Sequence, residues 1–246
     1  MSLETPFTLP TSDGHLINGI VNQASSKKAD KLLIMVHGLT GHFKEHIFVA
    51  AKDYFNAQGY DVVRFNLYDF PYSGKKFRRF AQTLLKDYIS DLNIIIDHFI
   101  PSYKKVFYAG HSYGGLTLML ANPKATAMAL WDPTFDPNSV QQDLRFIPEL
   151  DSYKIDWGIE ILVSKEFVEE NKNFDIKRRQ ELAAASKAPF RVIEAEEGGY
   201  RNSKTYSDYA KVPADKITIP GADHAFTLGD THRQLCEATE NWFNKF

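Results

Sequence analysis

Cysteine is almost missing from the sequence, and this scarcity limits how the fold can be held together. Cys236 is the only cysteine among 246 residues, so no disulfide can form within the chain. Because disulfides persist mainly in oxidising compartments, we expect a reducing environment and predict a cytoplasmic location. In agreement with this, Met1–Pro6 has neither the basic nor the apolar segment that opens a secretory signal peptide.

The sequence also lacks long apolar runs and a large excess of charge of either sign. No apolar run approaches the ~18 residues that a membrane-spanning helix needs, so we expect no membrane span. The 29 basic and 31 acidic residues nearly cancel to a formal net charge of −2. Without a basic excess, nucleic acid is not an expected partner.

The sequence also lacks the motifs of common metal and nucleotide sites. His42 and His46 are four residues apart, but the H-E-x-x-H pattern of zinc hydrolases is missing. The P-loop and the glycine pattern of dinucleotide-binding folds are missing too. We therefore expect neither a metal nor a cofactor.

What the sequence does contain is an alternation of strand-like and helix-like segments. Apolar residues make up 43% of the chain, enough for the core of one large α/β domain. Predicted strands at 31–36, 60–66 and 106–109 alternate with predicted helices at 46–57 and 80–99. This order predicts an α/β fold, in which helices flank both faces of a mostly parallel central sheet.

Residues 133–188 interrupt this alternation. The stretch is too long for an ordinary connection between a strand and a helix. We expect a hairpin formed by 153–157 and 159–163, followed by a helix over 171–186. We interpret the whole insertion as a small cap over the carboxyl edge of the sheet, so that 1–132 and 189–246 form the core.

The Gly-His-Ser-Tyr-Gly motif at residues 110–114 carries the clearest chemical signal. It follows the predicted strand 106–109 and precedes the apolar helical segment 113–121. A serine at a sharp turn from strand to helix has its hydroxyl exposed above the sheet, and the flanking glycines allow the close approach of strand and helix. This context predicts that Ser112 is a nucleophile.

With this motif, the sequence resembles the α/β-hydrolase superfamily over nearly its whole length. Two further motifs carry the resemblance, namely Val-His-Gly at 36–38 after an early strand and Gly-Ala-Asp-His at 221–224 near the end. The order of nucleophile and then histidine is that of the family. The resemblance implies a serine hydrolase similar to esterases and lipases, and the short cap is similar to that of small-ester and cinnamoyl-type esterases.

The resemblance also implies roles for several residues. His224 would take the proton of Ser112 as general base and return it as general acid. The backbone N–H groups of Tyr113 and Leu39 would form the oxyanion hole. We expect the His111 side chain to point away from Ser112, and we interpret His37 as a structural residue of the oxyanion loop.

The acid of the triad has two candidates. In the family an Asp usually follows the next-to-last strand, and here that position falls on Gly198, so the sequence departs from the pattern. One possibility is that Glu197 is the acid of the triad, with Glu196 less favoured. The other is that Asp132, at the end of the predicted strand 125–131, is the acid, as in some lipases of this fold. We favour Asp132 and keep Glu197 as the alternative.

These residues predict a serine hydrolase that cleaves a carboxylic ester of a small or medium acyl group, with a small-molecule substrate as its partner. Thioester, amide and carbon–carbon substrates use the same machinery, so the bond type stays open. The alternative from another class is a non-catalytic, receptor-like protein of the same fold that binds a ligand in the pocket. A basic cluster at 75–79 is interpreted as a solvated loop, with attraction of an acidic substrate as its alternative.

Overall fold

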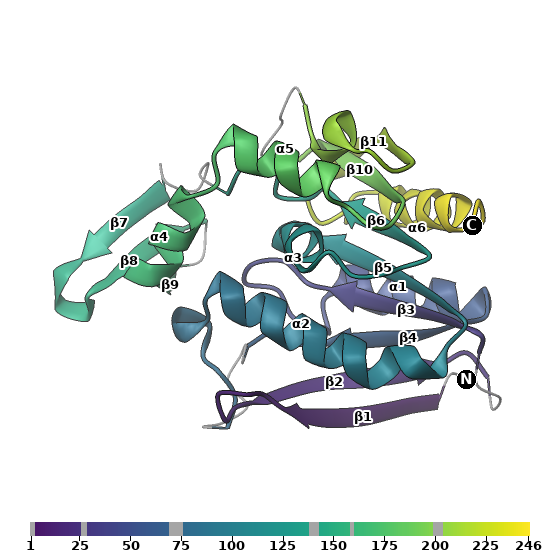
Figure 1. Cartoon of the computed structure of the whole chain (residues 1–246), viewed down its shortest axis with the longest axis horizontal. Helices are drawn as coiled ribbons and strands as arrows, with labels where there is room; N and C mark the ends of the chain where they lie inside the picture. The colour runs from purple at the N-terminus through teal and green to yellow at the C-terminus, as the bar shows by residue number, and fades with distance from the viewer. Residues whose placement is uncertain (1–2, 26–28, 69–75, 138–142, 158–159, 199–203) are drawn as a thin grey trace.

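The fold is built on a central mixed sheet. The computed structural model describes residues 3–25, 29–68, 76–137, 143–157, 160–198 and 204–246. In spatial order the strands are β1 (Leu3–Pro10), β2 (Leu16–Gln23), β4 (Tyr60–Phe65), β3 (Lys31–Val36), β5 (Lys105–His111), β6 (Ala127–Trp131), β10 (Phe190–Glu197) and β11 (Ala214–Asp223). β2 pairs antiparallel with β1 and β4, and the remaining pairs are parallel (Figure 1). This confirms the predicted α/β fold and its mostly parallel sheet.

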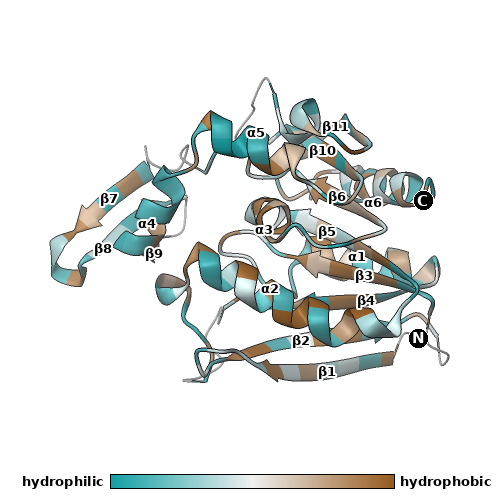
Figure 2. Ribbon diagram, in the orientation of Figure 1, coloured by the Kyte–Doolittle hydropathy of each residue, from teal (hydrophilic) through white to brown (hydrophobic). Residues whose placement is uncertain are grey.

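Helices cover both faces of this sheet. They are α1 (His46–Ala57), α2 (Leu85–Phe99), α3 (Tyr113–Ala121) and α6 (Thr231–Phe243). On β3, Ile34 belongs to one buried cluster with side chains of α2 and α3, whereas its neighbour Leu33 belongs to another with side chains of α1 and α6. Because successive side chains of a strand point to opposite faces, the two helix pairs lie on opposite faces. The central strands are thus buried on both sides, which explains their nearly continuous apolar sequence (Figure 2).

A smaller layer lies beside the carboxyl edge of the sheet (Figure 1). It consists of the antiparallel strands β7 (Leu144–Ile147), β8 (Ser152–Asp156) and β9 (Glu160–Ser164) and the helix α4 (Lys165–Lys172), and the next helix, α5 (Ile176–Ala184), packs against α3 of the core. The predicted hairpin is confirmed, because Tyr153 pairs with Val163 and Asp156 with Glu160. Strand β7 has no counterpart among the elements predicted from the sequence. The boundaries of the cap at 133 and 188 stay a prediction.

Two helix predictions need correction. The single helix expected over 171–186 was wrong, since α4 ends at Lys172 and α5 begins at Ile176, where the Asp175 carboxylate caps α5 by accepting a hydrogen bond from Arg178 N. The helix expected over 80–99 begins only at Leu85. Within the described residues, no helix combines the length and the apolar character that crossing a membrane requires.

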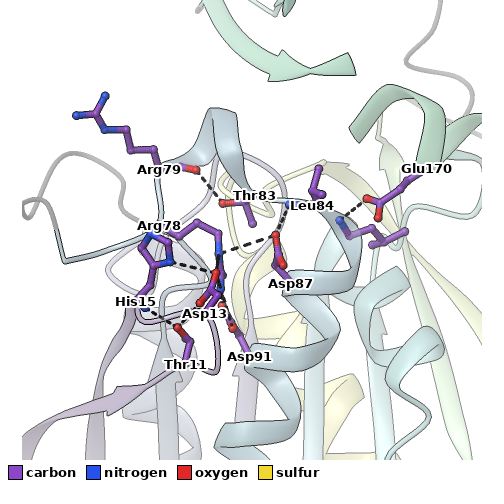
Figure 3. A network of polar contacts seen from close by, with 11 residues as sticks. Thr11, Asp13, His15, Arg78, Arg79, Thr83, Leu84, Asp87, Asp91 and Glu170 are labelled. Atoms are coloured by element: carbon purple, nitrogen blue, oxygen red, sulfur yellow. Dashed lines mark hydrogen bonds and ion pairs between the residues drawn. The ribbon is translucent and has the colours of Figure 1, made fainter. Parts of the chain in front are cut away.

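The basic cluster is only in part a solvated loop. Lys76 is exposed, and Lys75 lies outside the described residues, but Arg78 is buried. Its guanidinium contacts the carboxylates of Asp13 at 2.9 Å and Asp91 at 2.5 Å, and this joins the turn between β1 and β2 to helix α2 (Figure 3). Burial raises the pKa of Asp91 to about 6, against the opposing effect of Arg78. The carboxylate of Asp87 lies 3.8 Å from the same guanidinium, so three carboxylates surround Arg78 and this residue does not attract an acidic substrate.

Candidate active site

Ser112 stands at a sharp turn between β5 and α3. Its backbone has φ 52° and ψ −118°, a conformation that a non-glycine residue rarely adopts and that is typical of a serine nucleophile elbow. The Ser112 N–H donates to Trp131 O at 2.9 Å, and its carbonyl accepts from Thr134 N at 2.9 Å. At position 114, a Cβ atom would lie 2.2 Å from Val36 O, so the helix approaches β3 as closely as it does only because the residue is glycine.

Asp132 and His224 are in direct contact at the same edge of the sheet. Ser112 follows β5 and Asp132 follows the neighbouring strand β6, while His224 follows β11. The distance from His224 Nδ1 to Asp132 Oδ2 is 2.6 Å. The second carboxylate oxygen of Asp132 accepts a hydrogen bond from Ala195 N at 3.1 Å. Both oxygens of this carboxylate are therefore held, and one of them orients the imidazole.

The glutamates considered as alternative acids lie elsewhere. Glu197 is exposed at the end of β10 and pairs in register with Asp223. Glu196 Oε2 accepts a hydrogen bond from Gly221 N at 2.9 Å. Among the described residues, the carboxylate that contacts His224 is that of Asp132.

The Ser112 hydroxyl has a neighbour that was not predicted from the sequence. Its Oγ lies 3.5 Å from Thr134 Oγ1, and within the described residues no hydrogen bond joins it to His224. Long or incomplete contacts between nucleophile and base are common when no substrate is bound. Thr134 follows Asp132 by two residues, so one short segment after β6 contacts both the serine and the histidine.

Two other histidines support the site and are neutral. The Nε2 atom of His37 accepts a hydrogen bond from Leu67 N at 3.0 Å, so its Nδ1–H donates to Gly38 O at 2.8 Å. His111 Nε2 donates to His224 O at 2.8 Å. Burial lowers the pKa of His37 to about 4 and that of His111 to about 3. As expected, His37 has a structural role in the oxyanion loop, and the His111 ring packs against that of His224.

A small apolar cavity opens next to the elbow. It is lined by Leu39, Tyr113, Pro137, Leu144, Phe167, Val168 and Asn171. Among the described residues, the backbone N–H groups of Leu39 and Tyr113 have no hydrogen-bond acceptor. Two unpaired N–H groups beside one cavity can stabilise a negative oxygen.

Helix α4 fastens the small layer to the core by two polar contacts. Glu170 Oε2 accepts a hydrogen bond from Leu85 N at the start of α2, across 2.7 Å (Figure 3). The Tyr113 hydroxyl donates to Asn171 Oδ1 at 2.9 Å. The wall of the cavity thus depends on the position of α4. In the described part of the chain, no group of three or more His, Cys, Asp or Glu side chains is placed to hold a metal ion.

Comparison with known proteins places this geometry in context. Residues 27–220 match the family described as serine aminopeptidase, S33, and no curated protein matches the chain in sequence. Among solved structures, Est1E from Butyrivibrio proteoclasticus with ferulic acid bound is 20% identical, with a TM-score of 0.80 over 97% of this chain and 98% of that chain. The esterase domain of a Rhodothermus marinus protein is 19% identical, with a TM-score of 0.76 over 99% and 98%. Mouse alpha/beta hydrolase domain-containing protein 10 is 15% identical, with a TM-score of 0.74 over 98% and 99%. At these identities the similarity is one of fold.

Proposed function

Because the chain belongs to the serine aminopeptidase S33 family of α/β hydrolases, we propose that it is a serine hydrolase that cleaves a carboxylic ester of a small or medium acyl group. The observation that carries the proposal is the 2.6 Å contact between His224 and Asp132 at the edge where Ser112 stands. In the proposed triad Ser112 is the nucleophile, His224 the base and Asp132 the acid.

The reaction begins when the Ser112 side chain turns from Thr134 toward His224. Its Oγ attacks the ester carbonyl carbon while its proton passes to His224 Nε2, and the carboxylate of Asp132 stabilises the imidazolium. The carbonyl oxygen becomes negative and accepts hydrogen bonds from the N–H groups of Leu39 and Tyr113. Collapse of this intermediate breaks the ester bond, and the leaving alcohol takes the proton from His224.

The second half of the reaction releases the acid. A water molecule gives a proton to His224 and attacks the acyl group on Ser112, and the new tetrahedral intermediate again uses the two N–H groups. Its collapse returns the proton to Ser112 Oγ. The proposed mechanism uses only side chains and backbone groups of this chain.

The cavity supports the choice of an apolar acyl group, because the residues that line it are mostly apolar. An ester is favoured over an amide because the similar solved structures include Est1E and an esterase domain. Residues 133–188 are proposed to act as the cap over this cavity, and the lack of any cysteine besides Cys236 supports a cytoplasmic location.

Hydrolysis of p-nitrophenyl esters from acetate to decanoate tests the proposal. We expect turnover that is fastest among the short and medium chains, and a loss of about 10³-fold or more in Ser112→Ala. Thr134→Ser, which keeps a hydroxyl group next to Ser112, is the matched control and should retain activity. A wild-type protein that neither hydrolyses any ester of the series nor reacts with a fluorophosphonate would contradict the proposal.

One observation is compatible with a second function, that of a protein that only binds a ligand. The Ser112 Oγ lies 3.5 Å from Thr134 Oγ1, and among the described residues it has no hydrogen bond to His224, an arrangement that an unliganded hydrolase shares. Fluorophosphonate labelling separates the two functions, because a binding protein without an activated Ser112 is not labelled.

A further inference from the structure

Gly198 lies where any side chain would collide with the proposed acid. A Cβ atom built on Gly198 would stand 2.4 Å from Asp132 Oδ2 and 3.1 Å from Ala195 O, and Cβ atoms in proteins do not approach other atoms within 3.0 Å. We propose that Gly198 is a positioning residue that keeps open the space in which the Asp132 carboxylate holds His224. The inference rests on the proposed function, since it concerns the same triad.

Asp132 has no easy way to make room. Its Oδ1 accepts a hydrogen bond from Ala195 N and its Oδ2 contacts His224 Nδ1, so rotating the carboxylate breaks both. Its backbone is held as well, because Asp132 N donates to Ile193 O at 2.7 Å. Asp132 also has a φ of 39°, which a non-glycine residue adopts only when its surroundings impose it. A side chain at 198 would therefore move the carboxylate away from His224.

The end of β10 is shaped to bring Gly198 over the carboxylate. The pairing of β10 with β11 becomes irregular between Ala195 and Glu197. Directly after this irregularity, Gly198 N donates to Ala195 O at 3.1 Å. The same residue, Ala195, donates its own N–H to Asp132. One tight turn therefore both binds the carboxylate and places the glycine against it.

The distances imply that residue 198 has the reach to carry the acid itself. In an aspartate each carboxylate oxygen lies roughly 2.4 Å from its own Cβ, as bond lengths and angles require. This equals the distance from the Cβ position of Gly198 to Asp132 Oδ2. An aspartate at 198 can thus bring an oxygen to the point beside His224 Nδ1, provided that residue 132 is small. Positions 132 and 198 are alternative and mutually exclusive sources of one carboxylate.

A set of five proteins tests the inference: the wild type, Gly198→Ala, Asp132→Ala, the double variant Asp132→Ala/Gly198→Ala, and Asp132→Ala/Gly198→Asp. The readout is kcat/KM on p-nitrophenyl butyrate, with folding checked by circular dichroism. We expect Gly198→Ala to lower kcat/KM by about 100-fold in the wild type and by less than about 3-fold in the Asp132→Ala background, because the collision partner is then gone. We expect Asp132→Ala/Gly198→Asp to exceed Asp132→Ala by at least about 10-fold.

A second readout does not depend on activity. The His224 Nδ1 proton in a short hydrogen bond to Asp132 should give a far-downfield proton NMR signal in the wild type and in Asp132→Ala/Gly198→Asp, and this signal should be lost in Gly198→Ala. The inference is overturned if Gly198→Ala keeps wild-type activity and an intact signal. It is also overturned if Gly198→Ala lowers kcat/KM equally in the wild type and in Asp132→Ala, because the effect would then lie in the loop alone. If Asp132→Ala/Gly198→Asp has no higher kcat/KM than Asp132→Ala, positions 132 and 198 are not alternative sources of the carboxylate. If the wild type is neither active nor labelled by a fluorophosphonate, the proposed function fails, while the NMR signal still decides the role of Gly198.

Discussion

His111 holds the backbone of His224 in place. Its Nε2 atom donates a hydrogen bond to the His224 carbonyl across 2.8 Å, and the centroids of the two imidazole rings are 4.7 Å apart. His111 is the residue immediately before Ser112, so the end of β5 positions both the proposed nucleophile and the proposed base. The low pKa of His111, about 3 because of burial, keeps its ring neutral at working pH.

Substitution of His111 should therefore change catalysis and not only folding. His111→Phe removes the N–H donor and leaves the His224 carbonyl unpaired, which costs about 1–3 kcal/mol. We expect kcat for p-nitrophenyl butyrate to fall about 10-fold or more with little change in KM. His111→Gln, which keeps an N–H donor, is the matched control and should stay within about 3-fold of the wild type. Equal kcat values for the two variants would show that the hydrogen bond has no role.

The proposed nucleophile could be predicted from the sequence because its signal is local. Ser112 lies in a motif of five consecutive residues, and the apolar pattern on either side predicts a strand before the motif and a helix after it. The partners of the site are not local. The hydroxyl groups of Ser112 and Thr134 are 22 positions apart, and Tyr113 reaches Asn171 over 58 positions. No pattern along the chain reveals such contacts.

The choice of acid shows the same limit. From the sequence, Asp132 stands at the end of one predicted strand, and Glu197 follows another predicted strand of the same parallel sheet. What separates them in the structure is the 2.6 Å contact of Asp132 with His224, which the N–H of Ala195 and the open space at Gly198 support. Arg78 shows the same limit, because its partner Asp13 lies 65 positions away and its basic neighbours suggest a solvated loop.

Replacing each candidate acid by its amide should show which of the two acts in catalysis. Asp132→Asn keeps the size of the side chain but removes the charge that stabilises the His224 cation, so we expect kcat to fall by about 10⁴-fold. Glu197→Gln is the matched control, and because Glu197 is exposed we expect a change below about 2-fold. Steady-state hydrolysis of p-nitrophenyl butyrate measures both. A collapse in Glu197→Gln and not in Asp132→Asn would move the acid to β10.

Low pH should destabilise the folded protein because of its buried histidines. The pKa values of His37 and His111 are lowered by burial to about 4 and about 3 from an ordinary value of 6.5. Below pH 6.5 the unfolded chain binds protons that the folded chain does not, so the free energy of unfolding falls as the pH drops toward 4. Each histidine contributes up to about 1.4 kcal/mol per pH unit in this window.

Comparison of the wild type with His111→Gln isolates this effect from other groups, such as Asp91. The pKa of Asp91 is raised to about 6 by burial, and it therefore acts in the opposite direction. Urea unfolding at pH 7.0 and pH 4.5 should show a smaller loss of stability in His111→Gln than in the wild type. Identical losses would mean that His111 is protonated in the folded protein.

The contact between Tyr113 and Asn171 should control how well the cavity binds substrate. Both side chains are buried, at 3% and 4% exposure, and Asn171 Nδ2 is fixed by Phe167 O at 2.7 Å. Tyr113→Phe would leave Asn171 Oδ1 buried and unpaired at the junction of α4 with the core, at a cost of about 1–3 kcal/mol. Because the Tyr113 backbone N–H remains in place, we expect KM for p-nitrophenyl butyrate to rise about 5-fold or more while kcat changes little.

Tyr108 offers a matched control for this prediction. It lies on β5 and is fully buried, but its hydroxyl has no hydrogen-bond partner among the described residues. Removing an unpaired buried hydroxyl relieves a desolvation cost, so Tyr108→Phe should leave KM unchanged and should not lower the melting temperature. Tyr113→Phe should lower the melting temperature and raise KM together, since one hydrogen bond serves both the fold and the cavity wall. Equal KM values in the two variants would show that α4 keeps its position over the cavity without Asn171, and that the contact of Glu170 with Leu85 suffices to hold it.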